Sequence, residues 1–135
     1  MSRLFLLDAN ILSHAMRNTG GLAARRIQAA AAGECATSII VAAELRFGAE
    51  KRGSAELRRR VEATLHAIPI HPFASPADAV YGRLRVQLEA AGRPIGPNDM
   101  LIAAHALALD ATLVSANERE FRRVTGLRVE NWLAA

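Results

Sequence analysis

The chain has 135 residues, enough for one globular domain and too few for two, so we expect a single domain over residues 1–135. Hydrophobic residues make up 51% and charged residues 22%, which excludes an intrinsically disordered chain. The single cysteine excludes an intrachain disulfide and a cysteine zinc cluster, and the net charge of +4 fits either a polyanionic partner or simple solubility.

Predicted strands and helices alternate along the first half of the chain. The apolar run at residues 4–7 is typical of a strand buried on both faces. Asp8 ends this run too early for a signal peptide or a membrane span, so we expect a cytoplasmic protein. Four more elements follow: helices over residues 11–16 and 22–32, a strand over residues 36–41 and a helix over residues 42–50.

The alternation continues in the second half. Ser54 is a predicted helix cap, and the prolines within residues 67–73 indicate an edge strand or an irregular one. Two further helices are predicted to begin with Ser75 and Asn98 as caps. Strands are predicted over residues 111–115 and 127–129, with a helix over residues 118–124 between them. This order indicates a three-layer α/β domain with a mostly parallel sheet.

Three acidic residues follow predicted strands or lie on the helices that begin there, namely Asp8, Glu44 and Asp99. Sites in open α/β sheets form at the carboxyl ends of the strands. Carboxylates held together there repel one another, and a hard divalent cation that relieves the repulsion can activate water against a phosphodiester. Each residue alone also fits a structural role: Asp8 as a cap, Asp99 beside a helix dipole, and Glu44 in a surface ion pair.

Four sequence elements occur in a recognisable order, LLDANIL at residues 6–12, SIIVAAELRFGAE at 38–50, IGPNDMLIAAHA at 95–106 and TLVSANEREF at 112–121, with the tail GLRVENW at 126–132. Each is a weak motif, but the ordered set spans nearly the whole chain. It resembles the PIN-domain ribonuclease toxins of the VapC type.

The resemblance implies an α/β/α PIN domain and a Mg²⁺- or Mn²⁺-dependent endoribonuclease that cleaves structured RNA of translation, a tRNA or an rRNA. It implies that Asp8, Glu44 and Asp99 are the catalytic and metal-binding acids. It also implies a homodimer that is inhibited by a VapB-like antitoxin in a hetero-oligomer. Operator DNA would be bound only through the antitoxin, and no membrane is involved.

The fourth acidic position departs from the family pattern. Many PIN domains have an aspartate after the strand that here ends at Ser115, whereas this chain has Asn117, followed by Glu118 and Glu120. Asn117 would position a ligand or a water molecule, and Glu120 would supply a fourth carboxylate. The departure also allows a second interpretation, a catalytically weak PIN-like module that binds RNA or a protein.

The remaining candidates support the site or the substrate. Asn10 and Ser38 are predicted to orient the acidic residues by hydrogen bonding. The arginines predicted to contact RNA phosphates are Arg93 and the helical cluster of Arg58, Arg59 and Arg60, although such a cluster also fits a solvated helix face. The four histidines form no zinc motif, and His105 is predicted to pack against its own helix.

Overall fold

Five parallel strands form one central sheet in the computed structural model, which describes residues 3–133. The strands are β1 (Phe5–Leu7), β2 (Cys35–Ser38), β3 (Ile70–His71), β4 (Thr112–Val114) and β5 (Val129–Glu130). Their order across the sheet is β3-β2-β1-β4-β5, and every pairing is parallel. The predicted parallel sheet is therefore confirmed, as is the edge position of the proline-flanked strand β3.

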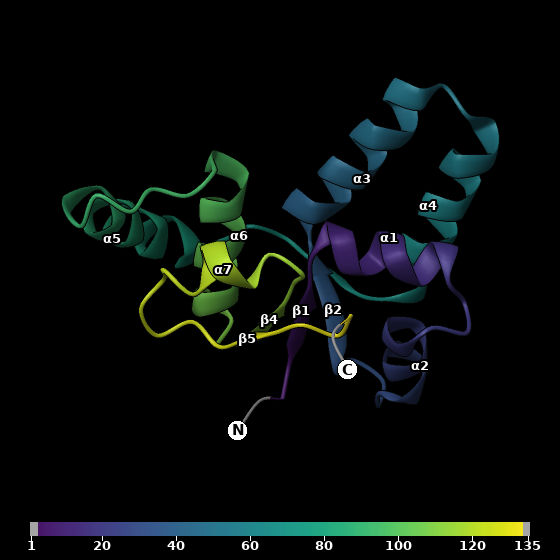
Figure 1. Cartoon of the computed structure of the whole chain (residues 1–135), viewed down its shortest axis with the longest axis horizontal. Helices are drawn as coiled ribbons and strands as arrows, with labels where there is room; N and C mark the ends of the chain where they lie inside the picture. Colours follow the sequence, from purple (N-terminus) through teal and green to yellow (C-terminus); the bar gives the residue numbers. More distant parts are fainter. Residues whose placement is uncertain (1–2, 134–135) are drawn as a thin grey trace.

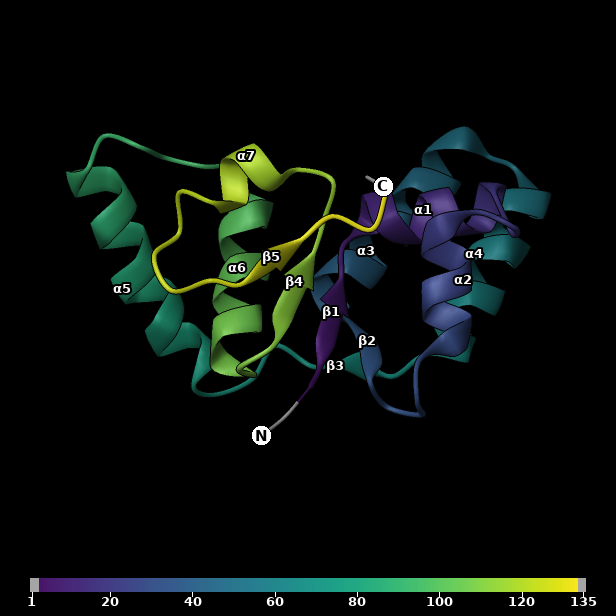
Figure 2. The same cartoon turned by 60° about the horizontal axis from the view of Figure 1, so that its bottom comes forward.

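Helices cover both faces of this sheet (Figure 1). The helices α1 (Ala9–Arg17), α2 (Leu22–Ala29) and α4 (Ala55–Ala67) lie on one side, and α3 (Ile39–Arg52) extends from the end of β2 beside α4. The helices α5 (Ala77–Ala90), α6 (Pro97–Ala108) and α7 (Glu118–Phe121) lie on the other side. Figure 2 shows the three layers from a second direction, with the sheet between the two groups of helices. No helix within residues 3–133 has the length and apolar character needed to cross a membrane.

The first strand lies at the centre of the sheet. Phe5 is in register with Cys35 of β2 on one side and with Thr112 of β4 on the other. Leu6 and Leu7 have no exposed surface, because helices cover both faces of a parallel sheet. This explains why the strand is a continuous apolar run rather than an alternating one.

The end of the described chain closes one side of the core. The Trp132 ring is 2% exposed and lies 5.2 Å from the ring of Phe5, centroid to centroid. Its indole N–H donates to Glu130 at 2.9 Å, and the Arg26 guanidinium lies 4.5 Å from its ring centroid. Residues near both ends of the chain thus pack together beside α2.

Local signals predicted some helix ends correctly and others wrongly. The Ser54 hydroxyl accepts from the Leu57 amide at 3.1 Å, so the predicted cap of α4 is confirmed. The predicted caps at Ser75 and Asn98 are wrong: α5 begins after Pro76, and Asn98 lies inside α6, which begins with Pro97 after Gly96. Proline suits the first helical position because it needs no amide hydrogen bond there, so Pro97 starts the helix before Asn98 is reached.

Several helix boundaries also differ from the prediction: α1 begins at Ala9 rather than at residue 11, and α7 ends at Phe121 rather than at residue 124. Residues 39–41 are helical rather than extended, because the Ser38 hydroxyl accepts from the Ile40 amide at 3.0 Å and caps α3 at once. The β-branched residues there favour a strand only as a weak tendency, which this cap overrides. The helix α2 ends at Ala29, before the predicted end at residue 32.

Candidate active site

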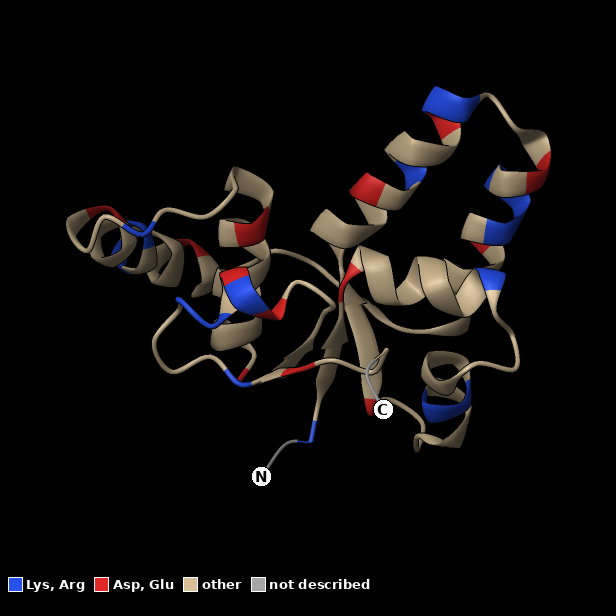
Figure 3. Cartoon of the chain, viewed as in Figure 1, with Lys and Arg blue, Asp and Glu red and all other residues tan. Residues whose placement is uncertain are grey.

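The parallel strands bring three chain segments to one edge of the sheet. Asp8 follows β1, Ser38 ends β2, and Ser115 follows β4. Figure 3 shows acidic segments of α3, α6 and α7, together with the turn between β1 and α1, around the space above this edge. This is the edge at which α/β proteins place their sites.

Asp8 is buried at this edge and held by two hydrogen bonds. Its side chain is 5% exposed, accepts from the Ala9 amide at 2.8 Å and accepts from the Ser115 hydroxyl at 2.8 Å. Burial raises the pKa of Asp8, and the two hydrogen bonds act in the opposite direction. Asp8 therefore caps α1 and also lies among the other acidic groups, so the structural role and the predicted catalytic role do not exclude each other.

Ser115 is a supporting residue that sequence reasoning missed. Besides donating to Asp8, its hydroxyl oxygen accepts from the Asn117 amide at 3.0 Å. The signal was present, because Ser115 is the last residue of a predicted strand. Asn10 acts nearby, where its side-chain oxygen accepts from the Ala116 amide at 3.1 Å. Asn10 thus holds the loop after β4 rather than a carboxylate directly.

Glu44 lies on the second turn of α3 and is only partly exposed. Its Oε1 atom is buried and has no hydrogen-bond partner among the described residues. Burial, and to a lesser degree the charge of Asp8, raise the pKa of Glu44. An unpaired buried carboxylate oxygen is costly, so this atom needs either a proton or a cation.

Asp99 belongs to a second acidic group at the start of α6. The Asn117 amide donates from one nitrogen to Asp99 at 3.2 Å and to Glu120 at 2.7 Å. Glu120 also accepts from the Gly96 amide at 2.7 Å, which holds the loop before α6. Asn117 and Glu120 both contact the Asp99 carboxyl group, Asn117 as a donor and Glu120 through a shared hydrogen bond.

Ionisation of Asp99 is opposed by its surroundings. Burial, followed by the charge of Glu120 and then that of Asp8, raises the pKa of Asp99 to about 7. The carboxyls of Asp99 and Glu120 share a hydrogen bond, which favours the proton on Asp99. The pKa of Glu120 is lowered, most by its bond from Gly96. The site thus holds more negative charge than the hydrogen bonds from the protein stabilise.

The donor set fits a hard divalent cation, although the side chains are not gathered around one point. No three His, Cys, Asp or Glu side chains among residues 3–133 stand close enough to ligate one ion together. Asp8 and Glu120 instead direct oxygens toward protein donors. Two observations indicate where positive charge is missing: the Glu44 oxygen has no hydrogen-bond partner among residues 3–133, and the pKa of Asp99 is raised. The carboxylates of Asp8, Glu44, Asp99 and Glu120 are oxygen ligands of the kind that Mg²⁺ and Mn²⁺ accept.

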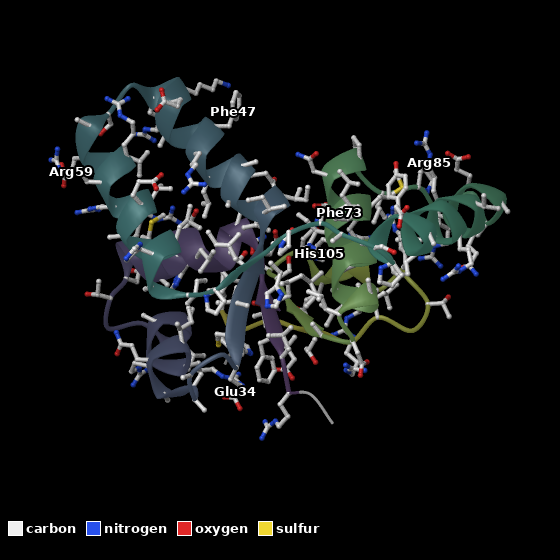
Figure 4. All side chains as sticks on the ribbon, turned by 180° about the vertical axis from the view of Figure 1, so that it is seen from behind. Glu34, Phe47, Arg59, Phe73, Arg85 and His105 are labelled. Carbon is white, nitrogen blue, oxygen red and sulfur yellow. The ribbon has the colours of Figure 1, made fainter. Side chains whose placement is uncertain are left out.

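The predicted RNA-binding arginines differ in their surroundings. Arg58 lies 3.9 Å from Glu50 in an exposed ion pair, whereas Arg59 and Arg93 form no ion pair with a described residue. Figure 4 shows Arg59 on the outer side of α4. A cavity of about 570 Å³ contains Glu44 in its lining together with Arg60, from the predicted arginine cluster, and with Arg17 and Arg52, which sequence reasoning missed. The signal of Arg17 and Arg52 was weak, because they lie on two different helices.

Comparison with known proteins agrees with this architecture. The PIN domain family model matches residues 5–127. The chain is 37% identical over 131 residues to ribonuclease VapC2 of Rickettsia felis, covering 96% of this chain and 98% of the relative. It is 35% identical over 129 residues to the tRNA(fMet)-specific endonuclease VapC of Shigella flexneri, covering 95% and 97%.

A solved structure gives the same result. The structure of VapBC2 from Rickettsia felis, bound to a DNA fragment from its promoter, contains a chain that superposes with a TM-score of 0.87 at 33% identity, covering 96% of this chain and 98% of that one. The sheet order, the acidic edge and these similarities lead to one assignment. The chain belongs to the PIN-domain family, in its VapC group.

Proposed function

We propose that this protein is the toxin of a type II toxin–antitoxin pair and acts in the cytoplasm as an endoribonuclease on structured RNA of translation. The observation that carries the proposal is the surplus of carboxylates at the carboxyl edge of the sheet. Above all, the buried Oε1 atom of Glu44 has no hydrogen-bond partner among residues 3–133. The similarity to a tRNA(fMet)-specific endonuclease favours a tRNA over an rRNA as the substrate.

Each acidic residue has a distinct part in the proposed reaction. Asp8, Glu44 and Asp99 would hold a Mg²⁺ or Mn²⁺ ion, which supplies Lewis acidity for phosphodiester hydrolysis when bound. Glu120 and Asn117 orient Asp99 through the hydrogen bonds described above, and Glu120 is also available as a fourth carboxylate. Ser115 fixes the direction of the Asp8 carboxylate, and Asn10 holds the loop that carries Ser115 and Asn117.

We further propose that a VapB-like antitoxin silences the site by lying in a groove between α1, α2 and α4. This groove has a volume of about 400 Å³ and is lined mainly by apolar groups, among them Leu12, Ala15, Ile27, Ala63 and Ile68. A helix with an apolar face fits such a groove. The cavity that contains Glu44 adjoins it, since Met16 and Arg60 line both, so a basic side chain of the partner can reach the acidic residues. Operator DNA would then be bound through the antitoxin.

A homodimer is the second part of the proposed assembly. Phe47 and Val86 are large apolar side chains that are 66% and 68% exposed, and a contact between two chains would cover such surface. Light scattering on the purified toxin would give a mass of two chains. A monomer at all concentrations would contradict the dimer without touching the proposed chemistry.

The deciding experiment is cleavage of total cellular RNA by the purified protein with Mg²⁺ or Mn²⁺. Asp99→Asn should abolish discrete cleavage, and sequencing of the fragment ends would identify the RNA. Asp78→Asn is the matched control, because Asp78 also lies in the first turn of a helix but is exposed on α5, away from the acidic group. Intact RNA with the wild-type protein, together with measurable RNA binding, would favour the second interpretation of a binding module without cleavage.

A further inference from the structure

A buried hydrogen bond connects the two helices that carry Glu44 and Asp99. The Ser38 hydroxyl, at the start of α3, lies 2.7 Å from Nδ1 of His105 on α6. Ser38 has no exposed surface and His105 is 1% exposed. The ring of Phe73 packs edge-on against the imidazole, with centroids 5.3 Å apart, and Figure 4 shows the two side chains next to each other. None of these three residues belongs to the acidic group.

The hydrogens of this contact can be assigned from its partners. The Ser38 oxygen already accepts from the Ile40 amide at 3.0 Å, and a hydroxyl has one hydrogen to donate. That hydrogen has an acceptor if Nδ1 of His105 is unprotonated, which places the ring hydrogen on Nε2. Burial, and to a lesser degree His71, lower the pKa of His105 and keep the ring neutral. A neutral ring with its hydrogen on Nε2 therefore gives the Ser38 hydroxyl an acceptor, while Nε2 itself has no hydrogen-bond partner among the described residues.

The Ser38–His105 bond is separated from Glu44 along α3 by as many residues as it is from Asp99 along α6. Glu44 comes six residues after Ser38 on α3, and Asp99 comes six residues before His105 on α6. Each separation corresponds to about 9 Å of helix rise. The helix α3 leaves the carboxyl edge of the sheet, whereas α6 runs back toward the amino edge, where β4 begins. Both carboxylates thus lie above the bond on the same side.

We propose that Ser38 and His105 are a positioning pair, whose hydrogen bond sets the separation of α3 and α6 and thereby the distance between the Glu44 and Asp99 carboxylates. The pair does not touch substrate or ion. Its effect is to hold two ligands of the proposed cation site at a fixed spacing, since carboxylates that repel each other separate unless the helices beneath them are fastened. This inference rests on the proposed metal-dependent nuclease function.

The test combines four variants with a direct measurement on the histidine. His105→Leu removes the acceptor while filling much of the space, and Ser38→Ala removes the donor. His105→Asn keeps an acceptor oxygen near the position of Nδ1 and serves as the conservative variant. Ser54→Ala is the matched control, because it removes an equivalent serine cap from α4, a helix that carries none of the acidic residues of the site.

Three readouts are needed: the ring ¹⁵N shifts of His105 in the metal-free protein, the dissociation constant for Mn²⁺ by calorimetry, and the metal-free melting temperature. We expect the neutral Nε2–H form of His105 in the wild type. We expect the Mn²⁺ dissociation constant to rise about tenfold in His105→Leu and Ser38→Ala, as for other residues that orient ligands indirectly. His105→Asn should recover most of the affinity, and Ser54→Ala should bind Mn²⁺ as the wild type does although it melts lower.

The outcomes separate this inference from the proposed function. A wild-type Mn²⁺ affinity in both His105→Leu and Ser38→Ala overturns the positioning pair, while RNA cleavage by the wild type leaves the nuclease intact. An equal loss of affinity in Ser54→Ala also overturns it, because the effect would then follow stability alone. A wild-type protein that neither binds Mn²⁺ nor cleaves RNA refutes the nuclease and the pair together.

Discussion

Asp99→Asn should inactivate the protein and at the same time stabilise its metal-free fold above neutral pH. The ordinary pKa of this aspartate is 3.8, and burial with the charges of Glu120 and Asp8 raises it to about 7. The unfolded chain therefore loses the proton near pH 4 and the folded chain near pH 7. Between these values the folded state binds more protons, so the free energy of unfolding falls as the pH rises.

The size of the effect follows from this difference. Each pH unit is worth about 1.4 kcal/mol, which sets an upper limit of about 4 kcal/mol. Asp99 is only half-buried, and solvent screening reduces the value to about 1–2 kcal/mol. For a domain of this length that is a rise in melting temperature of about 4–8 °C. An asparagine keeps the hydrogen bonds to Asn117 and Glu120 without the charge, because its amide resembles a protonated carboxyl.

The assay is thermal unfolding with EDTA at pH 8 and at pH 3. Asp99→Asn should melt higher than the wild type at pH 8, and the difference should nearly vanish at pH 3, where the carboxyl is protonated in both the folded and the unfolded wild type. Asp78→Asn should show no gain at either pH, since Asp78 is exposed. Equal melting of Asp99→Asn and the wild type at pH 8, or a lower melting temperature of the variant at both pH values, would refute the claim that the acidic groups oppose one another.

Three further predictions follow from the same site and its groove. Affinity for Mn²⁺ should increase as the pH rises through about 7, because Asp99 must lose its proton to bind the ion; calorimetry showing no change between pH 6 and pH 8 would contradict this. Ser115→Ala should destabilise the protein by about 1–3 kcal/mol in urea unfolding, since it leaves a buried Asp8 oxygen without its donor, and a change below the error of the measurement would count against that bond. Ala63→Arg, at an exposed position lining the apolar groove, should weaken antitoxin binding at least tenfold while RNA cleavage continues, and unchanged affinity would exclude this groove as the antitoxin site.

The arrangement of the sheet was predictable because its signals are local. Short apolar runs, such as the one at residues 4–7, are typical of strands buried on both faces, and the helices between them favour parallel pairing. The rule that sites form at the carboxyl ends of strands then placed Asp8 correctly at that edge. Caps were harder: Ser54 has the expected role, whereas the roles expected for Ser75 and Asn98 were displaced by adjacent prolines.

The details of the site could not be predicted because they depend on contacts between distant segments. The bond from Ser115 to Asp8 joins residues far apart in sequence, and so does the bond from Ser38 to His105. Sequence reasoning expected Ser38 to support a carboxylate and His105 merely to pack on its helix. Neither expectation contains the contact between them, which exists only after α3 and α6 are placed side by side. The catalytic roles of Asp8, Glu44 and Asp99 remain predictions for the experiments above.

The central position of β1 affects when the acidic site can form during synthesis. The first strand leaves the ribosome early, but Thr112, the partner of Phe5 on β4, is made more than a hundred residues later. Asp8 meets Ser115 and the group around Asp99 only after β4 has paired with β1. A nascent chain that is still short of β4 therefore has no assembled acidic edge. The topology thus delays assembly of the proposed nuclease site until β4 has been synthesised.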